Sequence, residues 1–340
     1  MHPISVTAPT RIADLGGWTD TWFAQHGVVC HLAVWPGIEV TLATHDGPPG
    51  VEVRVPNFER EWHWSPGTPA AVCPDPLLGA CLDENEIPDG AWLLEVRSDV
   101  PPGAAMGTSA SVCVAVLRAL DRLRGVEHDA AAVVRRAHAV ETRRLGQQSG
   151  VQDQWAAAAG GINLVTVARY PDSTCADVVI PVATRTALQA QLLVVLLPAQ
   201  HASSMLHDQV IQVLGPSVAE DPRIEALRAC ARDGATALTE GDLEAYGAVL
   251  TRNTDAQADL HPALVPDETR RVIAQLPPDD LLGWKVNGAG GTGGSLTLLA
   301  TSAEARARLV ARIADPLRVL DVRLAPRHPE LAGRASPEVV

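Results

Sequence analysis

The stretch that decides the fold of this chain is PPGAAMGTSASV, residues 101–112. Two glycines, Gly103 and Gly107, lead into small hydroxyl residues, and an apolar run with helical spacing, VCVAVLRALDRL, follows. Such a turn exposes backbone N–H groups at the positive end of a helix dipole, and this arrangement binds phosphate. Most glycine turns only cap a helix, so the prediction of a phosphate-binding loop depends on the other segments described below.

The loop differs from the two common nucleotide-binding motifs. No lysine follows Gly107, so GxxxxGK followed by Ser or Thr is absent, and GxGxxG is absent as well, although a strand is expected at 92–96. What remains is a phosphate cradle built mainly from main chain. Ser109 is placed to offer its hydroxyl to a metal ion.

Two carboxylates follow the loop on successive predicted helices. Glu141 lies in the C-terminal half of a helix expected over 129–146, and Asp153 lies near the start of a short Ala-rich helix. Taken alone, Glu141 is explained as a solvated helix residue and Asp153 as an N-cap. Phosphoryl transfer, however, requires one anionic group to hold Mg²⁺ and one to orient and deprotonate the attacking hydroxyl. With the loop, the two carboxylates predict that chemistry.

A third segment, WKVNGAGGTGGSLTLLA at 284–300, holds five glycines within seven residues between two short apolar strands. A glycine cluster in this setting indicates a tight turn or a close approach of backbone. Lys285 is the only lysine of the chain. It indicates a position that requires a compact ammonium group, with chance as the alternative.

These three segments, in this order, resemble the motifs of the GHMP kinases, a family named for galactokinase, homoserine kinase, mevalonate kinase and phosphomevalonate kinase. APTRIADLGGWTDTWFAQHGVVCHLAV resembles the first motif, PPGAAMGTSAS the second and KVNGAGGTGG the third. Within the family, GGWTDT and GVQDQWAAAAGGIN are most similar to the branch of fucokinases and D-glycero-D-manno-heptose 7-phosphate kinases. Those enzymes phosphorylate a sugar at its anomeric hydroxyl.

The resemblance covers nearly the whole chain and implies two domains. Strands and helices are predicted to mix without regular βαβ alternation, which favours an α+β fold. Residues 1–185 are expected to form an ATP-binding domain like the second domain of ribosomal protein S5. Residues 186–340 are expected to form a ferredoxin-like domain, with the active site in the cleft between the two.

The resemblance also implies roles for residues that match the motifs. Asp153 aligns with the catalytic base, and Arg11 would lie beside it and keep it ionised by charge pairing. Ser109 and Glu141 align with the residues that hold Mg²⁺, and Asp20 aligns with the acid that binds sugar hydroxyls. The loop expected to bind ATP comprises Pro102, Gly103, Ala104, Ala105, Met106, Gly107, Thr108 and Ser109, and the other expected substrate contacts are Gly16, Gly17, Trp18, His31, Gly288, Gly290 and Gly291.

The chain also departs from the family's pattern. Ala104 and Ala105 stand where Ser and Gly are usual, which removes a polar contact and costs free energy if the second position requires a positive φ. His31 stands where related sugar kinases often have Asn, and Thr292 interrupts the third glycine run. These changes bear on nucleotide affinity and on the identity of the acceptor.

Composition excludes some classes of partner. The net charge of −13 over 340 residues disfavours non-specific nucleic-acid binding. No run approaches the ~20 apolar residues of a membrane span, and no signal peptide is recognisable. Six cysteines are scattered without CxxC spacing, which indicates reduced thiols and a cytoplasmic location. The sequence leaves a homodimer open.

The expected function is that of an ATP- and Mg²⁺-dependent sugar kinase acting on the anomeric hydroxyl of a hexose or a heptose 7-phosphate. A cyclitol phosphate from secondary metabolism is an alternative acceptor. A catalytically silent regulator that binds a sugar or nucleotide on the same scaffold is an alternative of another class, favoured by Ala104 and Ala105. A decarboxylase of the same family is disfavoured by the sugar-type first motif.

Overall fold

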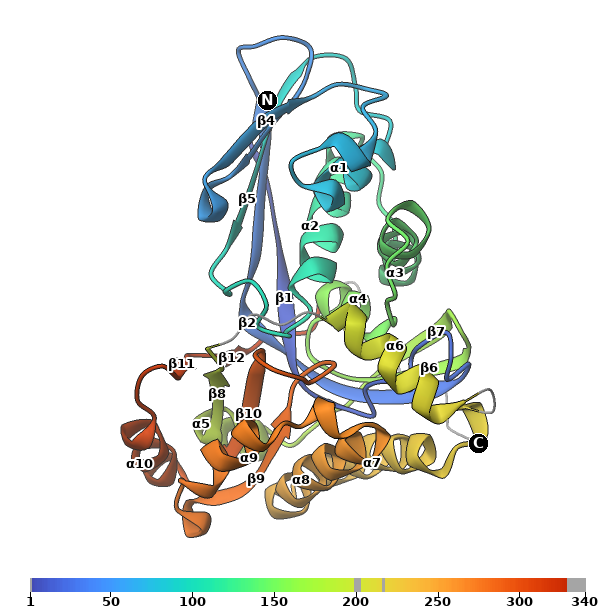
Figure 1. Ribbon diagram of the computed structural model, residues 1–340. Coiled ribbons are helices and arrows are strands. Elements are labelled where there is room, and N and C mark those ends of the chain that lie inside the picture. The colour runs from blue at the N-terminus through green and yellow to red at the C-terminus, as the bar shows by residue number, and fades with distance from the viewer. Residues whose placement is uncertain (1, 199–202, 216–217, 329–340) are drawn as a thin grey trace.

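The computed structural model describes residues 2–198, 203–215 and 218–328, which form two sheets with helices packed against them (Figure 1). The larger sheet is built around β2 (Gly27–Thr44), which pairs with β6 through residues 27–32 and with β5 through residues 38–44. The strand order is β4-β3-β5-β2-β6-β7, and β1 and β12 also pair with β2. Its other strands are β1 (Ile4–Leu15), β3 (Gly50–Val55), β4 (Arg60–Trp64), β5 (Ala91–Ser98), β6 (Ile162–Arg169), β7 (Asp172–Asp177) and β12 (Arg323–Leu324).

Four helices lie beside one face of the larger sheet in the upper half of Figure 1. The central one, α2 (Thr108–Leu123), packs on β1 and β2 through an almost continuous buried run, as its apolar spacing predicts. It begins directly after the phosphate loop, which we define as residues 101–107 between β5 and α2. The others are α1 (Pro76–Asp83), α3 (Ala130–Ala139), which continues into the π turn η3 (Val140–Arg144), and α4 (Gln152–Ala159).

The smaller sheet has the antiparallel order β11-β8-β10-β9. Its strands are β8 (Leu192–Leu196), β9 (Leu281–Val286), β10 (Ser295–Ala300) and β11 (Arg318–Leu320). Along the chain, helices lie between β8 and β9 and between β10 and β11, which is the β-α-β-β-α-β order of a ferredoxin-like unit. The helices of this half are α5 (Val182–Gln191), α6 (Ser203–Leu214), α7 (Pro222–Glu240), α8 (Leu243–Leu260), α9 (Asp267–Ala274) and α10 (Ala303–Arg312).

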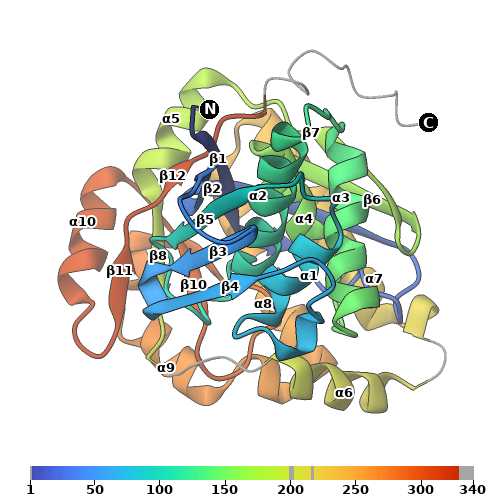
Figure 2. The ribbon, with the colours of Figure 1, turned by 90° about the horizontal axis from the view of Figure 1, so that it is seen from above.

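The two halves are joined more closely than a single linker would allow. The predicted boundary at 185/186 falls inside α5, and the chain later returns to the larger sheet as β12. Viewed from above, β12 lies beside β1 and β2 (Figure 2). The glycine loop is defined as residues 287–294 between β9 and β10. It lies close to the phosphate loop: Ser295, the residue that follows the glycine loop, donates a hydrogen bond of 2.6 Å to the Ala104 carbonyl. The division into two domains stays a prediction.

Candidate active site

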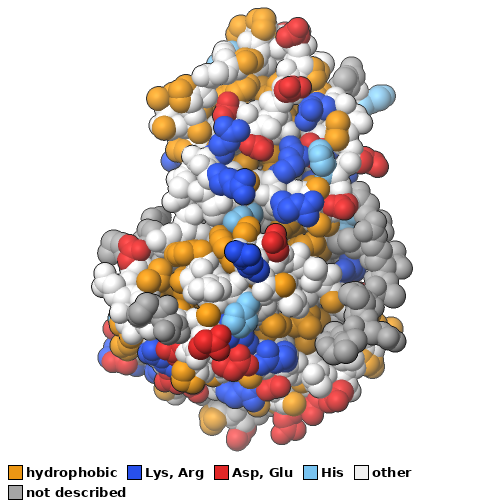
Figure 3. Space-filling view, turned by 90° about the vertical axis from the view of Figure 1, so that its right-hand side faces the viewer, with side chains coloured by type: hydrophobic (Ala, Val, Ile, Leu, Met, Phe, Trp, Pro, Cys, Tyr) orange, Lys and Arg blue, Asp and Glu red, His pale blue; other side chains and the backbone are white. Residues whose placement is uncertain are grey.

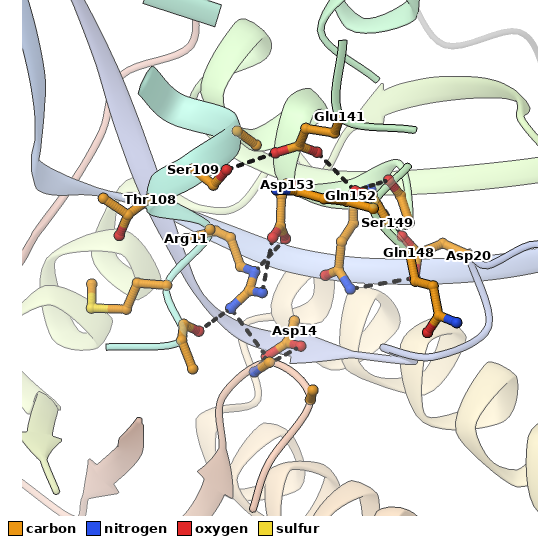
Figure 4. A pocket seen from close by; sticks show the side chains of 18 of the residues that line it. Arg11, Asp14, Asp20, Thr108, Ser109, Glu141, Gln148, Ser149, Gln152 and Asp153 are labelled. Atoms are coloured by element: carbon orange, nitrogen blue, oxygen red, sulfur yellow. Dashed lines mark hydrogen bonds and ion pairs between the residues drawn. The ribbon is translucent and has the colours of Figure 1, made fainter. Parts of the chain in front are cut away.

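A cavity of about 330 Å³ lies where β1, the phosphate loop and the glycine loop meet (Figure 4). It joins segments from all three regions of the sequence that predict phosphoryl transfer. Its lining consists of Arg11, Asp14, Trp18, Asp20, Thr21, residues 103–110, Glu141, residues 147–150, Gln152, Asp153, Gly288 and Ala289.

Arg11 and Asp153 form an ion pair in this cavity. Nε and Nη2 of Arg11 donate to the two carboxylate oxygens of Asp153 at 2.7 and 3.2 Å. Nη1 of Arg11 donates to the Ala105 carbonyl at 2.5 Å, and the Arg11 backbone N–H donates to the Met106 carbonyl at 2.9 Å. Burial lowers the pKa of Arg11, but the carboxylates of Asp153 and Asp14 outweigh it and raise that pKa. The guanidinium therefore stays charged and ties the phosphate loop to Asp153.

The phosphate loop has the conformation that a main-chain cradle requires. Gly103 and Gly107 both have positive φ, and Gly107 immediately precedes α2. A Cβ on Gly107 would lie 3.0 Å from the carboxyl carbon of Asp153, so glycine is needed there for space as well. Ala105 also has a positive φ of 55°, which an L-residue with a side chain adopts only at a cost.

Replacing Ala105 with glycine is therefore expected to raise the free energy of unfolding by about 0.5–1 kcal/mol, because glycine relieves the left-handed strain. Ala104→Gly is the matched control, because Ala104 is not among the described residues with positive φ. This change only increases the conformational entropy of the unfolded chain, so it should lower the free energy of unfolding. Urea denaturation of both variants measures the difference. Destabilisation by both changes would contradict the prediction.

Ser109 and Glu141 meet at the opposite wall of the cavity. The Ser109 hydroxyl donates to Oε1 of Glu141 at 2.9 Å, and Oε2 accepts from Ser149 at 2.8 Å and from Gln154 at 2.5 Å. Burial raises the pKa of Glu141, and the hydrogen bonds from Ser149 and Ser109 oppose that rise. Glu141 belongs to the π turn η3, a rare helical irregularity that occurs often at functional sites. The side chain is buried, so the alternative of a solvated helix residue is wrong.

These two side chains fit a magnesium ion. Both present oxygen donors to the same cavity, beside the loop expected to hold phosphates. Mg²⁺ is usually bound through one or two carboxylates together with substrate phosphates and water, so a full protein cage is not needed. Consistent with that, no group of three or more His, Cys, Asp or Glu with metal-binding geometry occurs in the part of the chain that the structure describes.

Asp20, in the segment between β1 and β2, is almost fully buried, and its carboxylate lies at the N-terminus of α4. One of its oxygens accepts the backbone N–H groups of Val151 and Gln152 at 2.8 and 2.9 Å. A Cβ on Gly150 would lie 2.1 Å from that oxygen, so glycine alone permits this approach. Burial raises the pKa of Asp20 to about 6, against the effect of the hydrogen bonds from Gln152 and Val151. Asp20 thus fixes the loop before α4 as well as lining the cavity.

This raised pKa predicts a pH-dependent stability. Between about pH 4 and 6 the folded protein binds more protons at Asp20 than the unfolded chain does, so stability falls as the pH rises through that range. Asp20→Asn removes this dependence. The stability of the wild type relative to the variant is expected to fall by up to about 3 kcal/mol between pH 4 and 6.5. Urea denaturation at several pH values measures this difference, and a constant difference would contradict the assignment.

Several residues predicted to contact substrate or ATP are not part of the cavity lining. His31 is fully buried, and its Nε2 lies 3.1 Å from the amide nitrogen of Asn163, which differs from the expectation that it shapes the sugar pocket. The reason is that the side chain of His31 points from β2 into the protein interior. Gly16, Gly17, Pro102, Gly290 and Gly291 are also outside the lining.

Packing explains the placement of those glycines. A Cβ on Gly16 would lie 2.2 Å from the Val28 carbonyl oxygen, and one on Gly290 would lie 2.2 Å from the Leu264 carbonyl oxygen. Their role in the structure is close backbone contact. Trp18 and Gly288, which are expected to contact substrate, line the cavity, and so do residues 103–109 of the expected ATP loop.

The sequence analysis missed two parts of the lining. One is the loop QQSG at 147–150, whose Gln148 bonds Asp208 of α6 at 3.1 Å and whose Ser149 bonds Glu141. Its position just before the helix of Asp153 was the available signal. The other is Asp14, which lies near the end of β1 and three residues after Arg11.

Comparisons with known proteins agree with this geometry. Residues 78–161 match the model of the GHMP kinases N terminal domain, and that span contains the phosphate loop, Glu141 and Asp153. The structure superposes on the mevalonate kinase of Methanococcus jannaschii with a TM-score of 0.76, covering 95% of this chain and 98% of that one at 14% identity. The chain has the GHMP kinase fold. The α+β fold and the family resemblance predicted from the sequence are thereby confirmed.

The structures of two sugar kinases are also similar to that of this chain. A Lactococcus lactis galactokinase complexed with galactose gives a TM-score of 0.73 at 15% identity, covering 96% of this chain and 95% of that one. A D-glycero-D-manno-heptose 1-phosphate kinase from Bacteroides thetaiotaomicron gives 0.72 at 15% identity, covering 95% and 96%.

A curated protein with a fucokinase activity is similar in sequence to this chain. The bifunctional fucokinase/GDP-fucose pyrophosphorylase of Arabidopsis thaliana is 24% identical over an alignment of 333 positions that covers 91% of this chain. The chain spans 31% of the length of that relative. No helix in the described ranges combines the length and the hydrophobicity that crossing a bilayer requires.

Proposed function

We propose that this chain is an ATP-dependent kinase that phosphorylates a sugar hydroxyl, with the anomeric hydroxyl of a hexose as the favoured acceptor. The observation that carries the proposal is the placement of the Arg11–Asp153 pair in one cavity with the phosphate loop and the Ser109–Glu141 contact. A cradle, a metal-binding pair and a carboxylate acting as base are the parts that phosphoryl transfer requires.

In this proposal the phosphates of ATP lie against the backbone N–H groups at the start of α2, and Ser109 and Glu141 hold Mg²⁺. A bound magnesium ion supplies electrostatic neutralisation of the charge that develops on the transferred phosphoryl group. The positive end of α2 adds to this effect. Basic and acidic side chains are interspersed on the face of the molecule seen in Figure 3.

Asp153 is proposed to orient the acceptor hydroxyl and take its proton. Its carboxylate faces the cavity and is held from one side by Arg11, so its orientation is fixed before substrate binds (Figure 4). Preorganised positioning supplies a large part of the rate in reactions of this kind. Asp20 is proposed to orient the sugar, and Trp18 offers an aromatic surface in the same lining.

The charges of the lining favour an uncharged acceptor over a sugar phosphate. Four carboxylates, those of Asp14, Asp20, Glu141 and Asp153, line this cavity; Lys285 pairs with Asp14 and Arg11 pairs with Asp153. Among the described residues the lining holds no further basic side chain, so a second phosphate on the acceptor would have no unpaired cation there. A hexose is therefore preferred to a heptose 7-phosphate or a cyclitol phosphate.

The proposal is tested by ADP release from Mg-ATP against free hexoses, heptose 7-phosphate and cyclitol phosphates. Turnover is expected on one free hexose, with slower or no turnover on the phosphorylated acceptors. ATP binding without turnover on any member, measured by a shift in melting temperature, would instead support the silent regulator. A sugar phosphate as the best acceptor would contradict the choice of an uncharged substrate.

The metal-binding role of Glu141 predicts a change in magnesium dependence. Glu141→Gln is expected to raise the Mg²⁺ concentration for half-maximal activity by about 10–100-fold, because an amide oxygen is a weaker ligand for a hard cation. A titration of activity with MgCl₂ at saturating ATP measures it. Glu61→Gln, at an exposed ion pair with Arg54, serves as the control and should leave the curve in place.

A further inference from the structure

Asp14 and Lys285 form a buried ion pair beneath the cavity. Nζ of Lys285 lies 3.5 Å from Oδ1 of Asp14, and both side chains are almost completely inaccessible to solvent. The ammonium also donates to Oε1 of Gln257 at 3.2 Å and to the Val286 carbonyl at 2.7 Å. Three oxygens thus surround a group that has three N–H donors. Lys285 itself is not part of the lining, so it acts on the cavity only through its neighbours.

Asp14 connects this lysine to two parts of the proposed machinery. Its carboxylate accepts the backbone N–H of Gly288, the first glycine of the glycine loop, at 3.1 and 3.2 Å. Its Oδ1 also lies 4.0 Å from Nη1 of Arg11 (Figure 4). The close contact of the glycine loop with Ala105 depends on the same position, because a Cβ on Gly288 would lie 3.0 Å from the Ala105 carbonyl oxygen.

Arg11 therefore lies between two carboxylates that compete for it. It binds Asp153 at 2.7 Å and approaches Asp14 only to 4.0 Å. An unpaired carboxylate at the position of Asp14 would attract this guanidinium strongly, because charges interact over short distances with little screening in a buried environment. Lys285 supplies the opposing charge that Asp14 would otherwise take from Arg11.

We infer that Lys285 and Asp14 are positioning residues for the proposed phosphoryl transfer: Lys285 neutralises Asp14, so that Arg11 stays on Asp153 and the glycine loop stays against the phosphate loop. The inference rests on the proposed role of Asp153 as base. It also gives the single lysine of the chain a physical role, since a compact ammonium on a flexible stem fits a fully enclosed site that the larger planar guanidinium does not match.

The test compares Lys285→Met, Asp14→Asn and the double variant in the full chain, by crystal structure and by steady-state kinetics. In Lys285→Met, Arg11 is expected to move onto Asp14 and leave Asp153. Its kcat should fall by about 10²-fold, with the KM for ATP nearly unchanged, because an ångström of misplacement near the reacting groups has that effect. In the double variant Asp14 no longer attracts Arg11, so the Arg11–Asp153 contact and at least about tenfold in kcat should return.

Thr297→Val is the matched control for loosening the same pair of strands. Thr297 lies opposite Lys285 in the register of β9 and β10 and bonds Asn287 at 2.8 Å, and its loss changes no charge. It should leave the Arg11–Asp153 contact in place. If Thr297→Val and Lys285→Met reduce kcat equally, or if Arg11 stays on Asp153 in Lys285→Met, the inference is overturned.

Two arrangements keep the test decisive. If Lys285→Met does not fold, Asp14→Asn and the double variant carry it: both lack the Asp14 charge, so both should retain Arg11 on Asp153, and loss of that contact in either overturns the inference. If the wild type turns over no acceptor, the proposed function fails, whereas the crystal structures still report whether Lys285 sets the position of Arg11.

Discussion

Asp153→Asn is expected to lower kcat by about 10³-fold while the KM for ATP changes little. The carboxylate is the group that faces the cavity beside the phosphate loop, and Arg11 fixes its orientation. The amide oxygen can still accept one of the two hydrogen bonds from Arg11, but an amide cannot take a proton, and proton transfer to a positioned side chain contributes about 10²–10⁴-fold. Steady-state kinetics with the best acceptor of the panel measures the effect.

Asp208→Asn is the matched control for this change. Asp208 is exposed, bonds Gln148 at 3.1 Å at the edge of the same region, and is not part of the lining. Its replacement should alter kcat less than about threefold, as for surface changes away from the reacting groups. If Asp153→Asn behaves like Asp208→Asn, the acceptor proton leaves by another route and Asp153 is not the base.

Arg11→Met is expected to lower the free energy of unfolding by about 3–5 kcal/mol, the largest stability effect among the proposed variants. The change leaves the carboxylate of Asp153 without its ion-pair partner and the Ala105 carbonyl without its donor, whereas Asp14 keeps Lys285. Removing one partner of a partly buried pair is costly because the remaining carboxylate loses the charge that compensates it. Urea denaturation at pH 7 measures the loss.

Arg54→Met provides the comparison at the surface. Arg54 pairs with Glu61 where both side chains are well exposed, so this change should cost at most about 1 kcal/mol. Adding Asp153→Asn to Arg11→Met should recover part of the lost stability, since it removes the uncompensated charge. Equal losses for Arg11→Met and Arg54→Met would contradict the assignment of a buried network.

The sequence predicted those parts of the site that depend on local chemistry. The glycine turn before a helix, and the two carboxylates that follow it, could be recognised because each occupies a short segment with a physical signature. The proximity of Arg11 to Asp153 came only from the resemblance, since nothing local brings β1 to α4. The alternative that Asp153 is an N-cap is wrong: α4 has Val151 at that position.

Some elements of the fold were missed although signals were present. The stretch 65–90 is rich in proline, yet it contains α1. Asp75 caps that helix by accepting two backbone N–H groups, and Pro76 follows at its first position, which is a recognisable N-terminal pattern. β2 is one strand across Pro36 and Gly37, because pairing with β1 continues along it with only a register shift.

The contacts that complete the site could not be predicted from the sequence. The pairing of Asp14 with Lys285 joins segments far apart in the sequence, and the π turn at Glu141 directly continues α3. His31 illustrates the opposite case: its place in the first motif predicted a sugar contact, whereas the direction of its side chain from β2 puts it in a buried network with Asn163. Side-chain direction of this kind is set by tertiary packing.

The most direct test of the central claim is a ³¹P NMR measurement of Mg-ATP with the free hexose that supports ADP release, for the wild type and for Asp153→Asn. The account predicts a new phosphate monoester signal that couples to the anomeric proton, formed by the wild type and about 10³-fold more slowly by the variant. A monoester formed at the same rate by both proteins, or ADP release by the wild type without any sugar phosphate, would contradict it.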